Sequence, residues 1–128
     1  MINNTRLQLA GFFIGTLLLS SIYACKNKST ENNNGEPVIY KGLYSYGPEV
    51  KSFKGCNNAH EFWVTDSSAR LELQYTQLGF EKKDVPVYVE VEAKKVPSTK
   101  DGPDSGYDST LIVTKLIKLT KDIPQGCN

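Results

Sequence analysis

Residues 66–79 read Asp-Ser-Ser-Ala-Arg-Leu-Glu-Leu-Gln-Tyr-Thr-Gln-Leu-Gly, a segment with the pattern of a short helix. The aspartate and the two serines at its start are good helix caps, and the final glycine suits the left-handed position at which many helices stop. Leu71, Tyr75 and Leu78 recur at spacings of four and three, so they form one apolar stripe. The segment therefore predicts a helix over residues 69–78 that buries this stripe.

Three strand patterns precede this helix. Residues 38–46 alternate, with the tyrosines on one side, and Gly42 within the run suggests a bend or bulge where one strand serves two sheets. Residues 49–55 predict a second, short strand with Phe53 buried. A turn follows, and residues 61–65 predict a third strand.

Two strand patterns follow the helix. Residues 85–93 alternate valine or alanine with polar and aromatic residues, the clearest two-residue period in the chain. The valines should therefore face a core. Residues 96–108 are rich in turn formers and predict a long hairpin loop, and the apolar residues of 111–119 predict a last strand.

The order of these elements is three strands, one helix and two strands. This is the order of the OB-fold, a five-stranded Greek-key barrel in which a helix between the third and fourth strands closes one end. We therefore expect an all-β domain with one short helix over residues 38–128. The alternative is an open meander of strands packed on the helix.

The amino terminus has the pattern of a lipoprotein signal peptide over residues 1–24. A charged start with Arg6 precedes an apolar run over residues 7–19, and a short segment that ends in the small residue Ala24 stands immediately before Cys25. The apolar run would span about 20 Å as a helix, less than the ~30 Å of a bilayer core. We expect cleavage after Ala24 and lipidation of Cys25 with palmitate or similar chains; the alternatives are ordinary secretion with a free thiol and a retained apolar helix.

Residues 25–37 are polar and end in Gly35, Glu36 and Pro37, a composition that predicts a flexible tether. The residue after Cys25 is Lys26. An aspartate at this position would favour retention at the inner membrane, so the lysine favours sorting to the outer membrane. The expected localisation is the bacterial cell envelope, with the domain attached to the membrane through the lipid on Cys25.

The three cysteines predict a disulfide. If Cys25 carries lipid, Cys56 and Cys127 remain as a pair in an oxidising compartment. Two free thiols, or a metal site that uses Cys56 and His60, are the alternatives. Since zinc usually takes at least three protein ligands, we expect no metal.

Charge disfavours a nucleic-acid partner. The chain has 15 basic and 14 acidic side chains, and removal of residues 1–24 takes away Arg6 and no acid, which leaves 14 of each. Nucleic-acid-binding domains usually carry a basic excess.

The sequence offers little support for an enzyme. Glu90 and Glu92 lie about 7 Å apart on one face of a strand, a spacing that could suit acid and base chemistry, but no nucleophile or base accompanies them. Three aspartates in the loop of residues 96–108 suggest calcium, yet their spacing differs from that of an EF-hand. We expect a solvated strand face, an ordinary loop, no cofactor and no catalytic activity.

Several segments together resemble the C-terminal OB domain of NlpE-type bacterial lipoproteins. They are Tyr40-Lys41-Gly42-Leu43-Tyr44-Ser45-Tyr46, Phe53-Lys54-Gly55-Cys56, the Trp63-bearing strand, Leu73-Gln74-Tyr75 in the helix, Pro86-Val87-Tyr88-Val89 and the cysteine near the carboxyl terminus. The resemblance implies an OB barrel with a structural disulfide between Cys56 and Cys127. It also implies an outer-membrane lipoprotein linked to copper homeostasis, surface sensing and envelope stress. The family's larger N-terminal barrel, with its cysteine pair, has no counterpart in this sequence, which leaves roles that rest on that part without support here.

The function expected from these features is that of a lipid-anchored, monomeric binding or sensor module without catalytic activity. Its partner would be an envelope protein; a glycan or peptidoglycan ligand is the alternative, and a hydrolase is a weaker one. OB domains commonly bind ligands across their second and third strands through aromatic and polar side chains. The candidate binding residues are Tyr40, Tyr44, Tyr46, Phe62, Trp63 and Tyr88.

Overall fold

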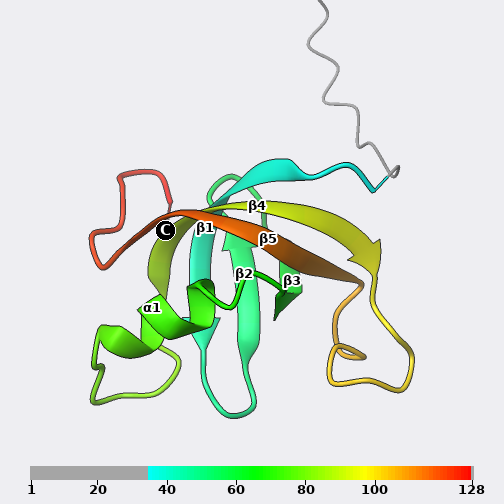
Figure 1. Cartoon of the computed structure of the whole chain (residues 1–128), viewed down its shortest axis with the longest axis horizontal. Helices are drawn as coiled ribbons and strands as arrows, with labels where there is room; N and C mark the ends of the chain where they lie inside the picture. The colour runs from blue at the N-terminus through cyan, green and yellow to red at the C-terminus, as the bar shows by residue number, and fades with distance from the viewer. Residues whose placement is uncertain (1–34, 128) are drawn as a thin grey trace, which may run out of the picture. The chain divides into compact units, whose positions relative to one another are not determined.

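The computed structural model describes residues 35–127 as five strands and one helix (Figure 1). The predicted signal peptide, Cys25 and most of the tether lie outside the described residues. The elements, in chain order, are β1 (Val38–Tyr46), β2 (Lys51–Gly55), β3 (Glu61–Asp66), α1 (Leu71–Gln77), β4 (Val87–Pro97) and β5 (Ser109–Thr120).

The strands form a closed barrel in the order β1-β2-β3-β5-β4, with β4 returning to β1. All neighbouring pairs are antiparallel except β3 and β5, which run parallel. Because β5, and not β4, lies beside β3, the sheet cannot be a simple meander. The OB-fold prediction is confirmed, and the open meander was the wrong alternative.

Gly42 lies where β1 begins to serve two neighbours. Its Cα is in register with Val89 of β4 and Gly55 of β2. A Cβ atom at this position would lie 2.2 Å from the backbone oxygen of Lys54 and 2.6 Å from the ring of Phe53. The close approach of the two strands therefore requires glycine here.

Apolar side chains from all five strands and the helix fill the barrel. The alternation predicted for the fourth strand is present, because Val87, Val89, Val91 and Ala93 are all buried. The rest of the core cluster consists of Tyr44, Phe53, Val64, Leu71, Tyr75, Leu111 and Val113.

The helix begins later than predicted. Ala69 has a φ of 55°, in the left-handed region, so the helix starts at Leu71. Leu71 and Tyr75 are buried as expected, whereas Leu73 is 51% exposed. Gly79 has a φ of 63° and ends the helix in the predicted conformation.

Three strands also start elsewhere than predicted. The second begins at Lys51 rather than at residue 49, the fourth at Val87 rather than at residue 85, and the fifth at Ser109 rather than at residue 111. The fourth is preceded by Pro86, which has no backbone N–H to donate to a ladder, and it continues to Pro97, into the segment predicted as loop. All these differences are at element ends, where sequence patterns are weakest.

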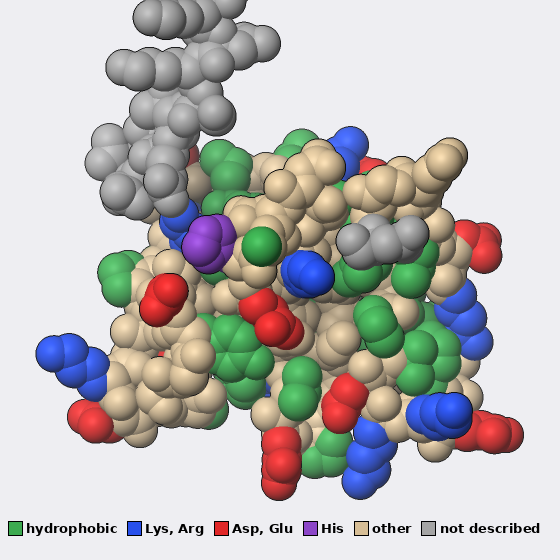
Figure 2. Space-filling view, turned by 180° about the vertical axis from the view of Figure 1, so that it is seen from behind, with side chains coloured by type: hydrophobic (Ala, Val, Ile, Leu, Met, Phe, Trp, Pro, Cys, Tyr) green, Lys and Arg blue, Asp and Glu red, His purple; other side chains and the backbone are tan. Residues whose placement is uncertain are grey.

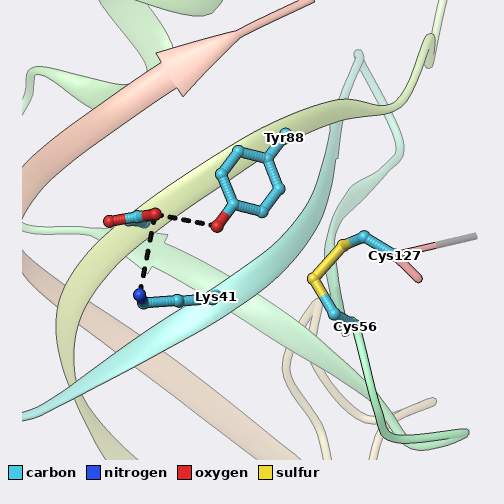
Figure 3. The surroundings of a disulfide bond; sticks show 5 residues. Lys41, Cys56, Tyr88 and Cys127 are labelled. Carbon is cyan, nitrogen blue, oxygen red and sulfur yellow. Dashed lines mark hydrogen bonds and ion pairs between the residues drawn. A yellow bond between two sulfur atoms is a disulfide. The ribbon is translucent and has the colours of Figure 1, made fainter. Parts of the chain in front are cut away.

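A disulfide joins Cys56, just after β2, to Cys127 near the carboxyl terminus, 71 positions later in the chain (Figure 3). Cys127 is 2% exposed, so the bond fixes the end of the chain against the barrel. Within residues 35–127, no helix has the length and apolar character needed to cross a bilayer.

Candidate functional site

The six predicted binding rings divide by burial. Tyr44, Trp63 and Tyr88 are buried, with exposures of 0%, 9% and 6%. The burial of half of the six rings agrees with the large contribution that aromatic residues make to small interiors. Tyr40, Tyr46 and Phe62 are partly buried, and their role in binding stays a prediction.

The structure does not bring these rings onto one surface. Tyr40 and Phe62 lie 6.5 Å apart, ring centre to ring centre, and both contact Phe53. Trp63 instead packs on Tyr107 in the loop between β4 and β5. Tyr46 belongs to a different group at the end of the barrel near α1.

The side chain of Tyr88 lies near Lys41 of β1 (Figure 3). Its hydroxyl donates a hydrogen bond to Glu90 Oε1 at 2.8 Å, and the same oxygen lies 3.8 Å from Lys41 Nζ. The hydrogen bond to Glu90 raises the pKa of the Tyr88 phenol. Glu92 instead accepts a hydrogen bond from Thr114. The two glutamates therefore have separate partners.

An aromatic cleft of about 340 Å³ lies between the turn after β1, the end of α1 and the loop that follows α1. These three segments gather at the same end of the barrel (Figure 1). The lining residues come from all three: Tyr46, Gly47, Pro48, Tyr75, Thr76, Gly79, Phe80, Lys82 and Lys83.

Tyr75 is the central ring of this aromatic cleft. Its ring centre lies 5.6 Å from that of Tyr46 in an edge-to-face contact and 5.5 Å from that of Phe80. On its inner side Tyr75 makes a second edge contact with Tyr44. Its hydroxyl donates to the carbonyl oxygen of Val85 at 2.7 Å. The ring is thus fixed at both ends, and burial raises the pKa of its phenol.

Lysines surround the rings. The two charged side chains that line the cleft are Lys82 and Lys83. The Nζ atom of Lys121 lies 4.7 Å from the ring centre of Phe80, and that of Lys51 lies 5.6 Å from the ring centre of Tyr46. Such placements are cation–π contacts.

Lys51 is also bound to the helix. Its Nζ atom lies 2.7 Å from Glu72 Oε1, and this hydrogen bond raises the pKa of the lysine. Lys51 therefore connects β2, Tyr46 and α1 on one side of the aromatic cleft.

Sequence reasoning found Tyr46 but missed Tyr75, Phe80 and the lysines. The sequence pattern places Tyr75 in the buried stripe of the helix, which is correct for one side of its ring. The signal that could have found the site is the sequence Gly79-Phe80, which places an aromatic residue directly after the helix end.

The calcium hypothesis finds no support in the loop between β4 and β5. Asp104 is 8% exposed, and its carboxylate accepts hydrogen bonds from the Thr99 backbone N–H, the Thr99 hydroxyl and the Thr110 hydroxyl. These donors lower the pKa of Asp104 to about 2. Among residues 35–127, no group of three His, Cys, Asp or Glu side chains could hold a metal ion. Asp104 thus organises the loop.

The comparison with protein families agrees with this architecture. The family model described as the NlpE C-terminal OB domain matches residues 34–128. No match was found among curated proteins or among solved structures. The matched region contains the whole barrel, both cysteines of the disulfide and all residues of the aromatic cleft. The chain belongs to the family of NlpE C-terminal OB domains.

Proposed function

We propose that this chain is a lipid-anchored binding or sensor module of the bacterial cell envelope, without catalytic activity, and that its partner docks in the aromatic cleft. Membership of the NlpE family supports an envelope lipoprotein context. The sequence before the barrel supports attachment through Cys25, with the outer membrane as the site.

The observation that carries this proposal is the aromatic cleft. Ligand sites in proteins are typically preformed, mostly apolar concavities with a few polar groups at their edges. The cleft has this character, since Tyr46, Tyr75 and Phe80 form an apolar floor and lysines stand beside it. Tyr75 is held by its hydrogen bond to Val85, so little order must be gained on binding.

The distribution of charged side chains on the surface supports a partner other than nucleic acid. Figure 2 shows one face of the molecule, on which acidic and basic side chains are interspersed. A polyanion favours a continuous basic surface instead.

Photo-crosslinking in intact cells tests the proposal. A photoreactive amino acid replaces Thr76, an exposed residue that lines the aromatic cleft, and the matched control replaces Ser105, an exposed residue of the β4–β5 loop. We expect a discrete crosslinked product from position 76, absent from position 105 and lost in the Phe80→Ala background. Equal products from both positions, or none from position 76, would contradict docking in this cleft.

Binding of cell-wall glycan is a second candidate function. The three aromatic rings of the aromatic cleft favour it, because sugar rings pack on aromatic faces. Sedimentation of the protein with purified peptidoglycan, compared between the native chain and Phe80→Ala, measures this function directly. Co-sedimentation that Phe80→Ala does not reduce would remove the aromatic cleft as the glycan site.

A further inference from the structure

We propose that the occupant of the aromatic cleft is an acidic peptide segment that places one apolar side chain on the aromatic floor and its carboxylates against the lysines. This inference rests on the proposed function and adds the chemical class of the partner. Three features of the aromatic cleft carry it: the sign of its charges, the position of the ammonium groups over the rings, and the fixed floor.

The charged side chains that line the cleft are both lysines. Both charged lining residues, Lys82 and Lys83, are basic and exposed, and neither makes an ion pair with another residue of the described part of the chain. The carboxylate of Glu72 is already paired with Lys51. Asp84 does not line the cleft, but its carboxylate lies beside the lining residue Gly47, and its charge contributes to the raised pKa of Tyr75. A ligand in the cleft therefore meets two unpaired ammonium groups in the lining and one carboxylate at the margin.

The ammonium groups also restrict how a ligand can use the rings. Lys121 stands over the ring of Phe80, and Lys51 stands over the ring of Tyr46. A sugar needs an open ring face on which to stack, and these lysines occupy one face of each of the two rings. A ligand that carries carboxylates gains from Lys121 beside Phe80 and from Lys82 and Lys83, because charge-assisted hydrogen bonds to ammonium are strong. Lys51 is already paired with Glu72. The arrangement favours an acidic ligand over a neutral glycan.

The floor of the cleft calls for an apolar group as well as an anion. Its rings present apolar surface in a volume of about 340 Å³, more than a carboxylate or phosphate alone would fill. Burial of one leucine-sized side chain against this surface would stabilise the complex through the hydrophobic effect. A peptide with a single apolar residue among aspartates and glutamates satisfies both the floor and the lysines.

Fluorescence anisotropy with synthetic peptides tests the proposal on the full-length lipidated protein in detergent. The probe is a labelled ten-residue peptide with one leucine flanked by aspartates and glutamates. One control peptide has serine in place of leucine, and the other has lysines in place of the acids. We expect the acidic leucine peptide to bind, both controls to bind more weakly, and added salt to weaken the acidic peptide.

Two charge-matched double variants distinguish binding at the aromatic cleft from nonspecific electrostatic attraction to the whole domain. Lys82→Glu/Lys83→Glu changes the cleft, and Lys54→Glu/Lys100→Glu changes two exposed lysines elsewhere by the same total charge. In the first variant, loss of two exposed charge pairs should weaken binding of the acidic peptide by about tenfold. The second variant should bind nearly as the native chain does. Equal weakening in both variants would overturn the inference.

The outcomes also separate this inference from the proposed function. If the crosslink at position 76 persists but acidic peptides do not bind, the partner is of another chemical class and the inference fails alone. If both are absent, the aromatic cleft is not a docking site and both fail. A soluble peptidoglycan glycan that binds equally well to Lys82→Glu/Lys83→Glu and at high salt would also overturn the inference, in favour of sugar recognition.

Discussion

The carboxylate of Asp66 accepts a hydrogen bond from the backbone N–H of Glu72 at 3.0 Å. Asp66 is the last residue of β3, and Glu72 lies in the first turn of α1. The other oxygen of Asp66 accepts from the backbone N–H of Ser68 at 3.1 Å. A strand residue thus satisfies a free N–H at the helix start, although Arg70, next to the helix, makes no side-chain cap. Asp66 thus joins the start of the helix to β3, and the ion pair between Lys51 and Glu72 joins the same turn to β2.

Asp66→Ala should destabilise the domain by about 1 kcal/mol, since the N–H of Glu72 and the turn at Ser68 both lose their acceptor. Urea denaturation measures this as a lower midpoint with an unchanged slope. The control is Asp101→Ala, an exposed residue of the β4–β5 loop, for which no shift is expected. A midpoint that is the same in both variants would show that Asp66 does not cap the helix.

Tyr44 and Tyr75 predict opposite effects of the same chemical change. Tyr44 is fully buried, and its hydroxyl has no hydrogen-bond partner among the described residues, whereas the hydroxyl of Tyr75 donates to Val85. An unpaired buried hydroxyl is unfavourable, so Tyr44→Phe should stabilise the fold by about 1 kcal/mol. Tyr75→Phe should destabilise it by about the same amount.

Chemical denaturation of the two variants side by side checks this contrast, since each removes one oxygen and leaves a ring. Tyr44→Ala provides the scale for loss of the whole ring, about 3–5 kcal/mol. If Tyr44→Phe weakened the domain as much as Tyr75→Phe does, the hydroxyl of Tyr44 would have a partner in solution.

The regular elements could be predicted because their signals are local. Alternating small apolar residues identified β4, and a glycine after an apolar stripe identified the end of the helix at Gly79. The start of the helix could not be found in this way. Asp66, one of the predicted caps, does satisfy the N–H of Glu72, but from the end of β3, and Ala69 between them takes a left-handed conformation that is uncommon for alanine.

The aromatic cleft could be predicted less well, because it depends on tertiary contacts. Tyr44 and Tyr46 have the same side chain on the same side of one strand, yet Tyr44 lies in the core and Tyr46 reaches the cleft. Both rings contact Tyr75 of α1, and Phe80 packs on Tyr75 in turn, so their surroundings are built by segments remote from β1 in the sequence. Alternation reveals which side of a strand a residue occupies but does not reveal what covers it.

Asp104 predicts how stability depends on pH. Its pKa is about 2 in the folded domain, against roughly 3.9 for an unfolded aspartate. Because the folded pKa is depressed, the stabilisation is fully present above about pH 4 and is lost as the pH falls toward and through 2. Asp104→Asn should therefore have a lower melting temperature than the native chain at pH 7. The difference between the two melting temperatures should become smaller as the pH falls.

Thermal melts of the native chain and Asp104→Asn between pH 7 and pH 2 measure this difference. The matched control is Asp101→Asn in the same loop, whose curve should run parallel to that of the native chain because its side chain is exposed. A difference between native and Asp104→Asn that stays constant across this range would contradict the depressed pKa.

The disulfide between Cys56 and Cys127 should stabilise the domain by about 4 kcal/mol, because it closes a loop of 71 positions and restricts the unfolded chain. Cys56→Ser/Cys127→Ser should lower the free energy of unfolding by this amount. Reduction of the native chain should have the same effect, and reductant should leave the double variant unchanged. Intact mass with an alkylating agent provides the independent check: two alkylated positions at residues 56 and 127 in freshly isolated, unreduced protein would show that the bond is absent.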